Sequence, residues 1–136
     1  MTALPDPALE RLRSALAGNA LVRLAVLFGS RASGTARPSS DFDVGILPHD
    51  PSFALRDELA LSSVLSGAVG GEVDLVRLDR DDPLLGREVS LSCICLYEAE
   101  PGAFAAYRAA AASRWIEFDE TIAPHRQRLL RRLAGT

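Results

Sequence analysis

Apolar and polar positions along the chain follow two periods, which predict alternating helices and strands. Leucines spaced three and four residues apart indicate amphipathic helices, and nearly continuous apolar runs indicate buried strands. The pattern predicts, in chain order, a helix over 5–17, a strand over 21–28, a short helix ended by Gly34, a strand over 42–47, a helix over 52–66, a strand over 72–78, a helix starting at Asp82-Pro83, a strand over 93–98 and a helical segment over 103–133. This order predicts an α/β fold with helices layered against a sheet. We expect Leu55, Leu59 and Leu65 to face the core.

The C-terminal helical segment carries a wide aromatic stripe between Phe104 and Ile122, whose members recur every three or four residues. We expect most of this stripe to be core, with one exposed edge available for a partner. Pro124 is predicted to kink or break the helix. The arginines between 126 and 132 are interpreted as a solvated helix end or as a contact for an acidic partner surface.

Composition narrows the class of protein. The chain has 136 residues, which predicts a single domain, and 48% hydrophobic with 24% charged residues is typical of a folded protein. A net charge of −3 argues against a general nucleic-acid coat. All 15 basic residues are arginine, so any phosphate contact must come from arginine, backbone N–H groups or a metal ion.

Features of targeting and redox chemistry point to a cytoplasmic protein. The N-terminus lacks a signal-peptide pattern, and the longest uncharged stretch, 59–71, is too short and too rich in serine and glycine to span a membrane. Cys93 and Cys95 are separated by one residue, a spacing that strains a disulfide. With only these two cysteines and two distant histidines, a zinc site is not expected. Both are interpreted as small apolar strand residues.

Three aspartates stand in apolar surroundings where charge is costly. Asp41 and Asp43 form a D-x-D pair at the start of one predicted strand, and Asp74 lies inside another. If the two strands are neighbours, the three carboxylates converge on one face, because alternate strand residues share a face. Such a cluster repels itself unless divalent cations bind it. Magnesium, which prefers oxygen ligands and phosphate, is the expected ion, and a two-metal site is the expected arrangement.

A Gly-Ser turn precedes the aspartate pair and suits the other half of a nucleotide site. Gly29 lets backbone approach an anion closely, and Ser30 adds a hydroxyl donor at a helix start. Together with the carboxylates, this turn could hold a nucleoside triphosphate.

Each feature also has a plainer interpretation. A Gly-Ser pair can be only a turn, a D-x-D pair can be a solvated loop or a cap, and Asp74 could pair with Arg77 or Arg87. Arg31, Arg37 and Arg77 could contact phosphate or could be solvated or ion-paired, and Arg31 is the best placed because it follows Ser30.

Taken together, these residues resemble the G-S-x10-D-x-D signature of minimal nucleotidyltransferases of the DNA polymerase β-like superfamily. Ten residues separate Gly29-Ser30 from Asp41-Phe42-Asp43, and Val73-Asp74-Leu75-Val76 is similar to the third carboxylate strand. Leu96-Tyr97-Glu98 and the aromatic helix around Asp119 also look like this family. The resemblance extends over nearly all of residues 1–136, with a core at about 20–100. Ser33 departs from it, because members often carry arginine there, and this could weaken a phosphate or partner contact.

The resemblance implies a polymerase β-like nucleotidyltransferase fold: a small mixed sheet with helices packed against it and a long C-terminal helical segment. It also implies an MNT antitoxin of a HEPN/MNT toxin–antitoxin pair, which transfers AMP from ATP to a tyrosine of the HEPN ribonuclease toxin in a hetero-oligomeric complex. Membrane and direct nucleic-acid binding are not implied. Carried over by position, Gly29 and Ser30 hold triphosphate, Asp41 and Asp43 bind magnesium and the nucleotide, and Asp74 helps to bind metal and deprotonates the attacking hydroxyl.

Two other classes of function stay open at this stage. The chain could be a non-catalytic antidote that blocks a toxin sterically, although such a protein has no need of three strand aspartates. It could also be a small-molecule nucleotidyltransferase of the aminoglycoside-modifying kind. Those enzymes usually carry a second, helical substrate domain, and little chain remains here after the core.

Overall fold

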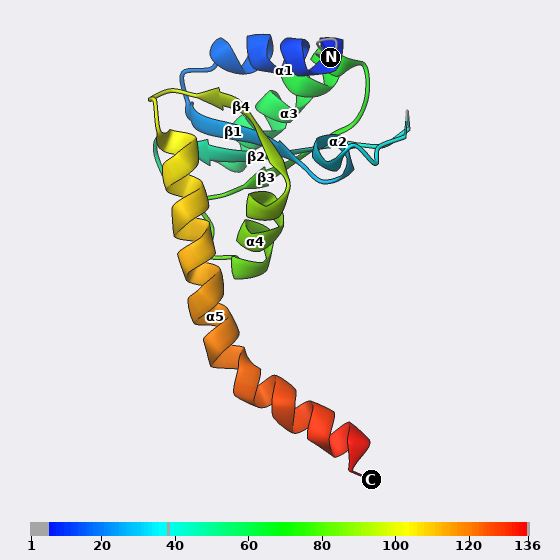
Figure 1. The fold of residues 1–136 in the computed structure, drawn as a ribbon. Coiled ribbons are helices and arrows are strands. Elements are labelled where there is room, and N and C mark those ends of the chain that lie inside the picture. Colours follow the sequence, from blue (N-terminus) through cyan, green and yellow to red (C-terminus); the bar gives the residue numbers. More distant parts are fainter. Residues whose placement is uncertain (1–5, 38, 136) are drawn as a thin grey trace.

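The computed structural model describes residues 6–37 and 39–135, and its elements follow the predicted order (Figure 1). Helices and strands alternate as α1 (Pro7–Ala17), β1 (Val22–Phe28), α2 (Ser30–Ser33), β2 (Phe42–Pro48), α3 (Leu55–Val69), β3 (Val73–Arg77), α4 (Pro83–Leu91), β4 (Cys93–Glu98) and α5 (Ala103–Ala134). Aspartates cap two of the helices: Asp6 accepts a hydrogen bond from the Ala8 N–H at 2.9 Å, and Asp82 accepts one from the Leu85 N–H at 3.1 Å. Pro5, where the first helix was predicted to begin, lies outside the described residues.

The four strands form one mixed sheet in the order β3-β2-β1-β4. The β1 strand pairs antiparallel with both β2 and β4, whereas β2 and β3 are parallel. A parallel pair needs a crossover connection, and α3 supplies it between β2 and β3. The predicted small mixed sheet is therefore confirmed, and its parallel pair brings two aspartate-bearing strands side by side.

Helices cover both faces of the sheet and create two apolar clusters (Figure 1). On one face, α1 and α3 pack against strand residues such as Leu27, Val44 and Val73. On the other face, α4 and α5 pack against Leu24, Val26 and Phe28. Alternate residues of a strand point to opposite faces, so the strand residues directly next to Val44 and Val73 point toward α4 and α5. This is the face to which Asp43 and Asp74 belong.

The packing of α3 differs from the prediction. Leu55 and Leu59 are 66% and 63% exposed, and the buried positions are Leu61 and Leu65. The helix begins at Leu55 rather than at Ser52, and its sheet-facing side also carries serines. One of them, Ser66, accepts a hydrogen bond from the Val73 N–H at 3.3 Å. The periodicity of leucines alone could not reveal which of two apolar sides faces the sheet.

Both cysteines lie in β4 and are free thiols. Their side chains are half-buried and pack against the cluster on the α4 and α5 face. Burial raises the pKa of both the Cys93 and the Cys95 thiol. They are apolar strand residues, as predicted.

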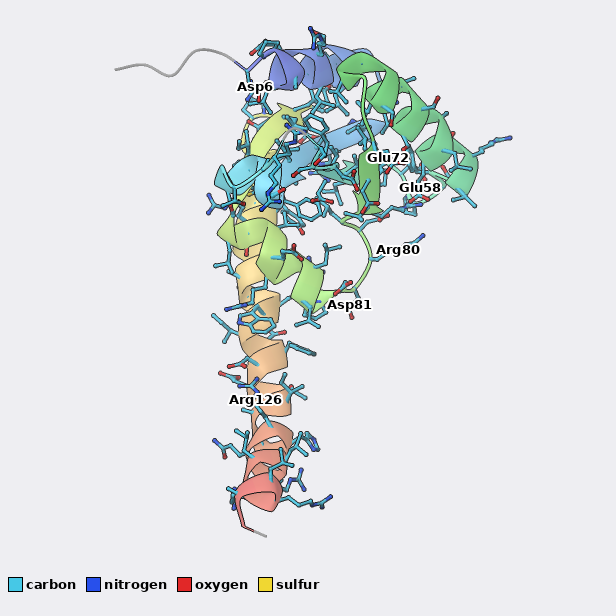
Figure 2. The ribbon with its side chains drawn as sticks, turned by 90° about the vertical axis from the view of Figure 1, so that its right-hand side faces the viewer. Asp6, Glu58, Glu72, Arg80, Asp81 and Arg126 are labelled. Atoms are coloured by element: carbon cyan, nitrogen blue, oxygen red, sulfur yellow. The ribbon has the colours of Figure 1, made fainter. Side chains whose placement is uncertain are left out.

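The long helix α5 packs on the sheet only at its start. Tyr107 and Ala111 are buried there, whereas Leu129 and Leu133 near its end are exposed. Pro124 lies inside the helix and does not end it. Figure 1 shows the second half of α5 leaving the sheet as an arm, and Figure 2 places Arg126 beyond α4.

Within residues 6–37 and 39–135, no helix combines the length and apolar character needed to cross a membrane.

A charged cluster fixes the end of β3 to the start of α3. The Arg77 guanidinium donates to both carboxylate oxygens of Asp79 at 3.0 and 2.7 Å, donates to the Phe53 carbonyl and lies 3.8 Å from Glu58. Only 10% of the Arg77 side chain is exposed. Removing it would leave partly buried acceptors without their donor, which is costly.

We therefore expect Arg77→Ala to lower the free energy of unfolding by about 2 kcal/mol in urea titrations. The hydrogen bond from Arg77 holds the pKa of Asp79 below its ordinary value. A depressed carboxyl pKa stabilises the folded state above the unfolded pKa, and this contribution disappears as the pH falls through the folded pKa. The variant should thus approach the wild type in acid. Arg80→Ala, at an exposed neighbouring position, is the matched control and should change little.

Candidate active site

The turn after β1 places a glycine where no other residue fits. Gly29 has φ 72° and ψ −153°, a conformation that L-residues rarely adopt. A Cβ atom at this position would lie 2.4 Å from Oδ2 of Asp43. The Gly29 carbonyl accepts hydrogen bonds from the Ala32 and Ser33 N–H groups, both at 3.1 Å, which starts α2. The glycine thus lets the backbone of the turn lie against the Asp43 carboxylate.

Strand register brings two of the predicted carboxylates together. Asp43 of β2 is paired with Phe28 of β1 on one side and with Asp74 of β3 on the other. Paired residues on adjacent strands point to the same face. Asp43 is half-buried and Asp74 is exposed, so the pair opens to solvent at this end of the sheet. The two strands are neighbours, so the condition for the predicted convergence of their carboxylates is met.

Further carboxylates lie close enough to Asp43 to change its pKa. Burial raises the pKa of Asp43 above its ordinary value, and the negative charges of Asp74, Glu88 and Asp41 raise it further, in that order. Glu88, on α4, was not singled out from the sequence. Its signal is weak: Gly86 and Val89 are buried, which places Glu88 at the border of the packed side of α4. Only the docking of α4 on this face of the sheet brings it to Asp43.

Asp41 stands just before β2 rather than inside the strand, and it is exposed. Strand alternation therefore does not hold it, in contrast to the prediction. The guanidinium of Arg31 fixes its neighbours instead: Nη2 donates to the Ser40 carbonyl at 2.8 Å, and the guanidinium lies 4.1 Å from the centre of the Phe42 ring. Arg31 thus supports the loop that carries Asp41.

Two hollows adjoin Asp41. One, of about 520 Å³, is lined by Arg31, Asp41, Phe42 and the segment after α3. The other, of about 300 Å³, is lined by Asp41, Asp74 and serines of α3. Glu72, labelled in Figure 2, lines both. Their volumes lie in the range of small-ligand sites.

Of the other arginines considered as ligands of phosphate or partners of Asp74, Arg77 and Arg87 have other contacts, and Arg37 lies in the loop before Asp41. Arg77 sits at the opposite end of β3 from Asp74 and binds Asp79, so it neither pairs with Asp74 nor lies at the site. Arg87 lies over the Trp115 ring, 4.7 Å from its centre. The Arg37 backbone N–H donates to the Ser40 hydroxyl at 2.9 Å, which shapes the loop before Asp41.

The carboxylates suit magnesium without forming a complete ligand cage. Among the described residues, no group of three or more His, Cys, Asp or Glu side chains is arranged to hold a metal ion by itself. Asp43 and Asp74 are nevertheless neighbours in register, with Asp41 close enough to raise the pKa of Asp43. Magnesium usually takes one or two carboxylates and completes its shell with water and substrate phosphate. The carboxylates of Asp41, Asp43 and Asp74 therefore fit a magnesium site that water and substrate phosphate would complete.

The crowded carboxylates carry a testable cost in stability. Because the pKa of Asp43 is raised, its charged form is less favourable in the folded than in the unfolded chain. This penalty is present above the folded pKa and disappears as the pH falls through it. We expect Asp43→Asn to raise the urea midpoint at neutral pH in EDTA, and to raise it less in acid. An unchanged or lowered midpoint at neutral pH would contradict the electrostatic account.

A mixed sheet with a Gly-Ser turn facing aspartates on adjacent strands defines the nucleotidyltransferase class of the polymerase β type. The sequence profile of the family described as "Polymerase beta, Nucleotidyltransferase" matches residues 10–101. The chain therefore belongs to this family. The matched span contains Gly29, Asp43 and Asp74 and ends before α5.

Solved structures with the same fold include toxin–antitoxin complexes. A chain of a toxin–antitoxin structure with AMP-PNP is 20% identical, with a TM-score of 0.76 over 90% of this chain and 98% of that chain. A chain of the complex between tri-AMPylated Shewanella oneidensis HEPN toxin and MNT antitoxin is 17% identical, with a TM-score of 0.71 over 90% and 96%. A structure described as that of a "putative minimal nucleotidyltransferase" is 32% identical over 63% of this chain and 86% of its own, with a TM-score of 0.52. A comparison with curated proteins gave no match.

Proposed function

We propose that the chain is the MNT antitoxin of a HEPN/MNT pair and silences its HEPN ribonuclease partner by transferring AMP from ATP to a toxin tyrosine. The observation that carries this proposal is the register of Asp43 beside Asp74, with Gly29 against the Asp43 carboxylate. Family membership supports nucleotidyl transfer. Chains with this fold in complexes with AMP-PNP and with an AMPylated toxin support the nucleotide and the acceptor.

The residues at the site have separate tasks in this proposal. Gly29 leaves room for phosphate at the turn, and the Ser30 hydroxyl donates to it. Asp41, Asp43 and Asp74 would hold magnesium, which neutralises charge on the triphosphate and the leaving group when bound. Arg31 keeps the loop of Asp41 in place through the Ser40 carbonyl.

The proposed reaction moves one bond and one proton. The tyrosine oxygen attacks the α-phosphorus of ATP, the bond from that phosphorus to the bridging oxygen breaks, and pyrophosphate leaves with the bonding electrons. A tyrosine hydroxyl has a pKa of about 10, so it is neutral near pH 7 and must lose its proton to a base. Asp74 is exposed beside Asp43 and is the proposed base.

We expect Asp74→Asn to lower the rate of AMP transfer by about a hundredfold, the lower range for loss of a general base. Single-turnover rates measured against pH separate this role from metal binding. The variant should lose the dependence on the ionised base and regain rate as the acceptor hydroxyl ionises in alkali. Full AMP transfer with magnesium still bound would remove Asp74 from the role of base.

Two labels and two acceptors test the proposed function. The chain is incubated with magnesium and ATP that is radiolabelled at the α- or the γ-phosphate, together with the HEPN partner or an aminoglycoside. We expect α-label and no γ-label on the partner. α-Label on the aminoglycoside alone would identify a small-molecule nucleotidyltransferase. Neutralisation of the partner without any label would identify a binding antidote.

A further inference from the structure

The apolar stripe of α5 continues past the point where the helix leaves the sheet. Tyr107 and Ala111 are buried against the core, and the same side of the helix continues through Phe118 and Ile122 to Leu129 and Leu133, at intervals of four and seven residues. Leu129 and Leu133 are 56% and 69% exposed. A stripe that the domain covers at one end and leaves open at the other is the mark of an interaction surface.

The outer side of α4 connects this stripe to the candidate active site. Leu84 and Leu91 are two helical turns apart on one side of α4 and are 60% and 67% exposed. Glu88 lies between them in the sequence, and its negative charge helps to raise the pKa of Asp43. Arg87, on the other flank, lies over the Trp115 ring of α5, 4.7 Å from its centre. The helix α4, which carries these exposed leucines, lies beside α5 on the face of the sheet to which Asp43 belongs (Figure 1).

The charge of the arm indicates what kind of surface it meets. The last acidic residue of the chain is Glu120, and four arginines follow it, at positions 126, 128, 131 and 132. Of these four arginines, only Arg126 has an ion-pair partner among the described residues, Asp119 at 2.8 Å. Arg128 instead donates a hydrogen bond to the His125 ring at 2.8 Å. A cationic helix end with exposed leucines complements an apolar surface rimmed by carboxylates.

We propose that the outer side of α4 and the exposed stripe of α5 form one docking surface for the protein acceptor of AMP. In this arrangement, the acceptor packs apolar side chains on Leu84, Leu91, Leu129 and Leu133 and places carboxylates opposite the arginines of the arm. Its hydroxyl then enters the site from the α4 side. The inference rests on the proposed function in taking the acceptor to be a protein. The helix α4 packs on the face of the sheet that carries Asp43, which is where an acceptor must be held.

Matched double substitutions test this surface. Leu84→Glu with Leu91→Glu changes α4, and Leu129→Glu with Leu133→Glu changes the arm. Leu55→Glu with Leu59→Glu is the control, because these leucines are equally exposed but lie on α3, on the opposite face of the sheet. Binding to a ribonuclease-dead variant of the HEPN partner is measured by calorimetry, and circular dichroism and ATP binding verify the fold and the site. We expect each test pair to weaken partner binding by roughly tenfold or more, and the control to stay within about twofold of the wild type.

The outcomes separate this inference from the proposed function. Wild-type affinity in both test pairs, or an equal loss in the control, would overturn the docking surface even if AMP transfer is observed. Selective loss in the test pairs supports it even if no AMP reaches the partner, a result that would overturn only the proposed chemistry. Sedimentation of the chain alone covers the other occupant: a dimer that dissociates in the Leu129→Glu, Leu133→Glu variant would show that a second copy fills the stripe and would overturn the proposal.

Discussion

Asp43→Asn is expected to lower AMP transfer to the HEPN partner by about 10⁴-fold while the protein stays folded. Asp43 is the carboxylate on which the site centres, because β2 places it between β1 and β3 and Gly29 abuts its oxygen. Losing its charge removes a carboxylate that would hold a divalent cation beside the triphosphate. Stabilisation by such a cation amounts to several kcal/mol in the transition state, and each 1.4 kcal/mol changes a rate about tenfold.

The control for this result is a carboxylate outside the site. Asp50→Asn changes an exposed aspartate just after β2 and should leave transfer within about twofold of the wild type. Rates come from quenched reactions with α-labelled ATP at saturating magnesium. A rate for Asp43→Asn within tenfold of the wild type would remove this carboxylate from the catalytic centre.

Gly29→Ala is expected to lower AMP transfer by about a thousandfold. The backbone at φ 72° strains an alanine, and its Cβ would meet Oδ2 of Asp43 at 2.4 Å. Strain of this kind costs about 1–3 kcal/mol, and the carboxylate must move away from its place between the strands. Displacement of a catalytic group by about 1 Å can cost a further hundredfold in rate.

Gly34→Ala separates strain from displacement. Gly34 also has a positive φ, 82°, but nothing lies within 4 Å of an added Cβ. This variant should lose stability in urea titrations and retain AMP transfer to within about tenfold. Equal losses of transfer in the two variants would show that backbone strain near α2, rather than contact with Asp43, controls the rate.

Local patterns were enough to predict the elements and to single out the two main carboxylates, whereas the pairing of their strands was left as a condition that the structure meets. Asp43 and Asp74 stand out because each interrupts an apolar run, and a strand–helix–strand unit makes their strands parallel neighbours. The role of the glycine in the turn could also be predicted, because a Gly-Ser pair after a buried strand suits a tight turn against an anion. These features depend on residues close in sequence or on a single crossover.

Features that depend on how helices and loops pack against the sheet could not be predicted from the sequence. Glu88 reaches Asp43 only because α4 packs on the carboxylate face, and no spacing in the sequence reveals which face a helix covers. The same limit explains Leu55 and Leu59, whose periodicity fits a buried side as well as an exposed one. Arg31 follows Ser30, yet its guanidinium reaches the Ser40 carbonyl, a contact set by how the loop folds back.

Durable silencing of the toxin is the most direct test of the central claim. The HEPN partner is incubated with the chain, magnesium and ATP, then separated from the chain by chromatography, and its ribonuclease activity and intact mass are measured. Covalent AMP transfer predicts that the separated toxin stays inactive, is heavier by whole AMP units on a tyrosine, and is unmodified after incubation with the Asp43→Asn variant. A toxin that regains full activity at its unmodified mass once the chain is removed would contradict it.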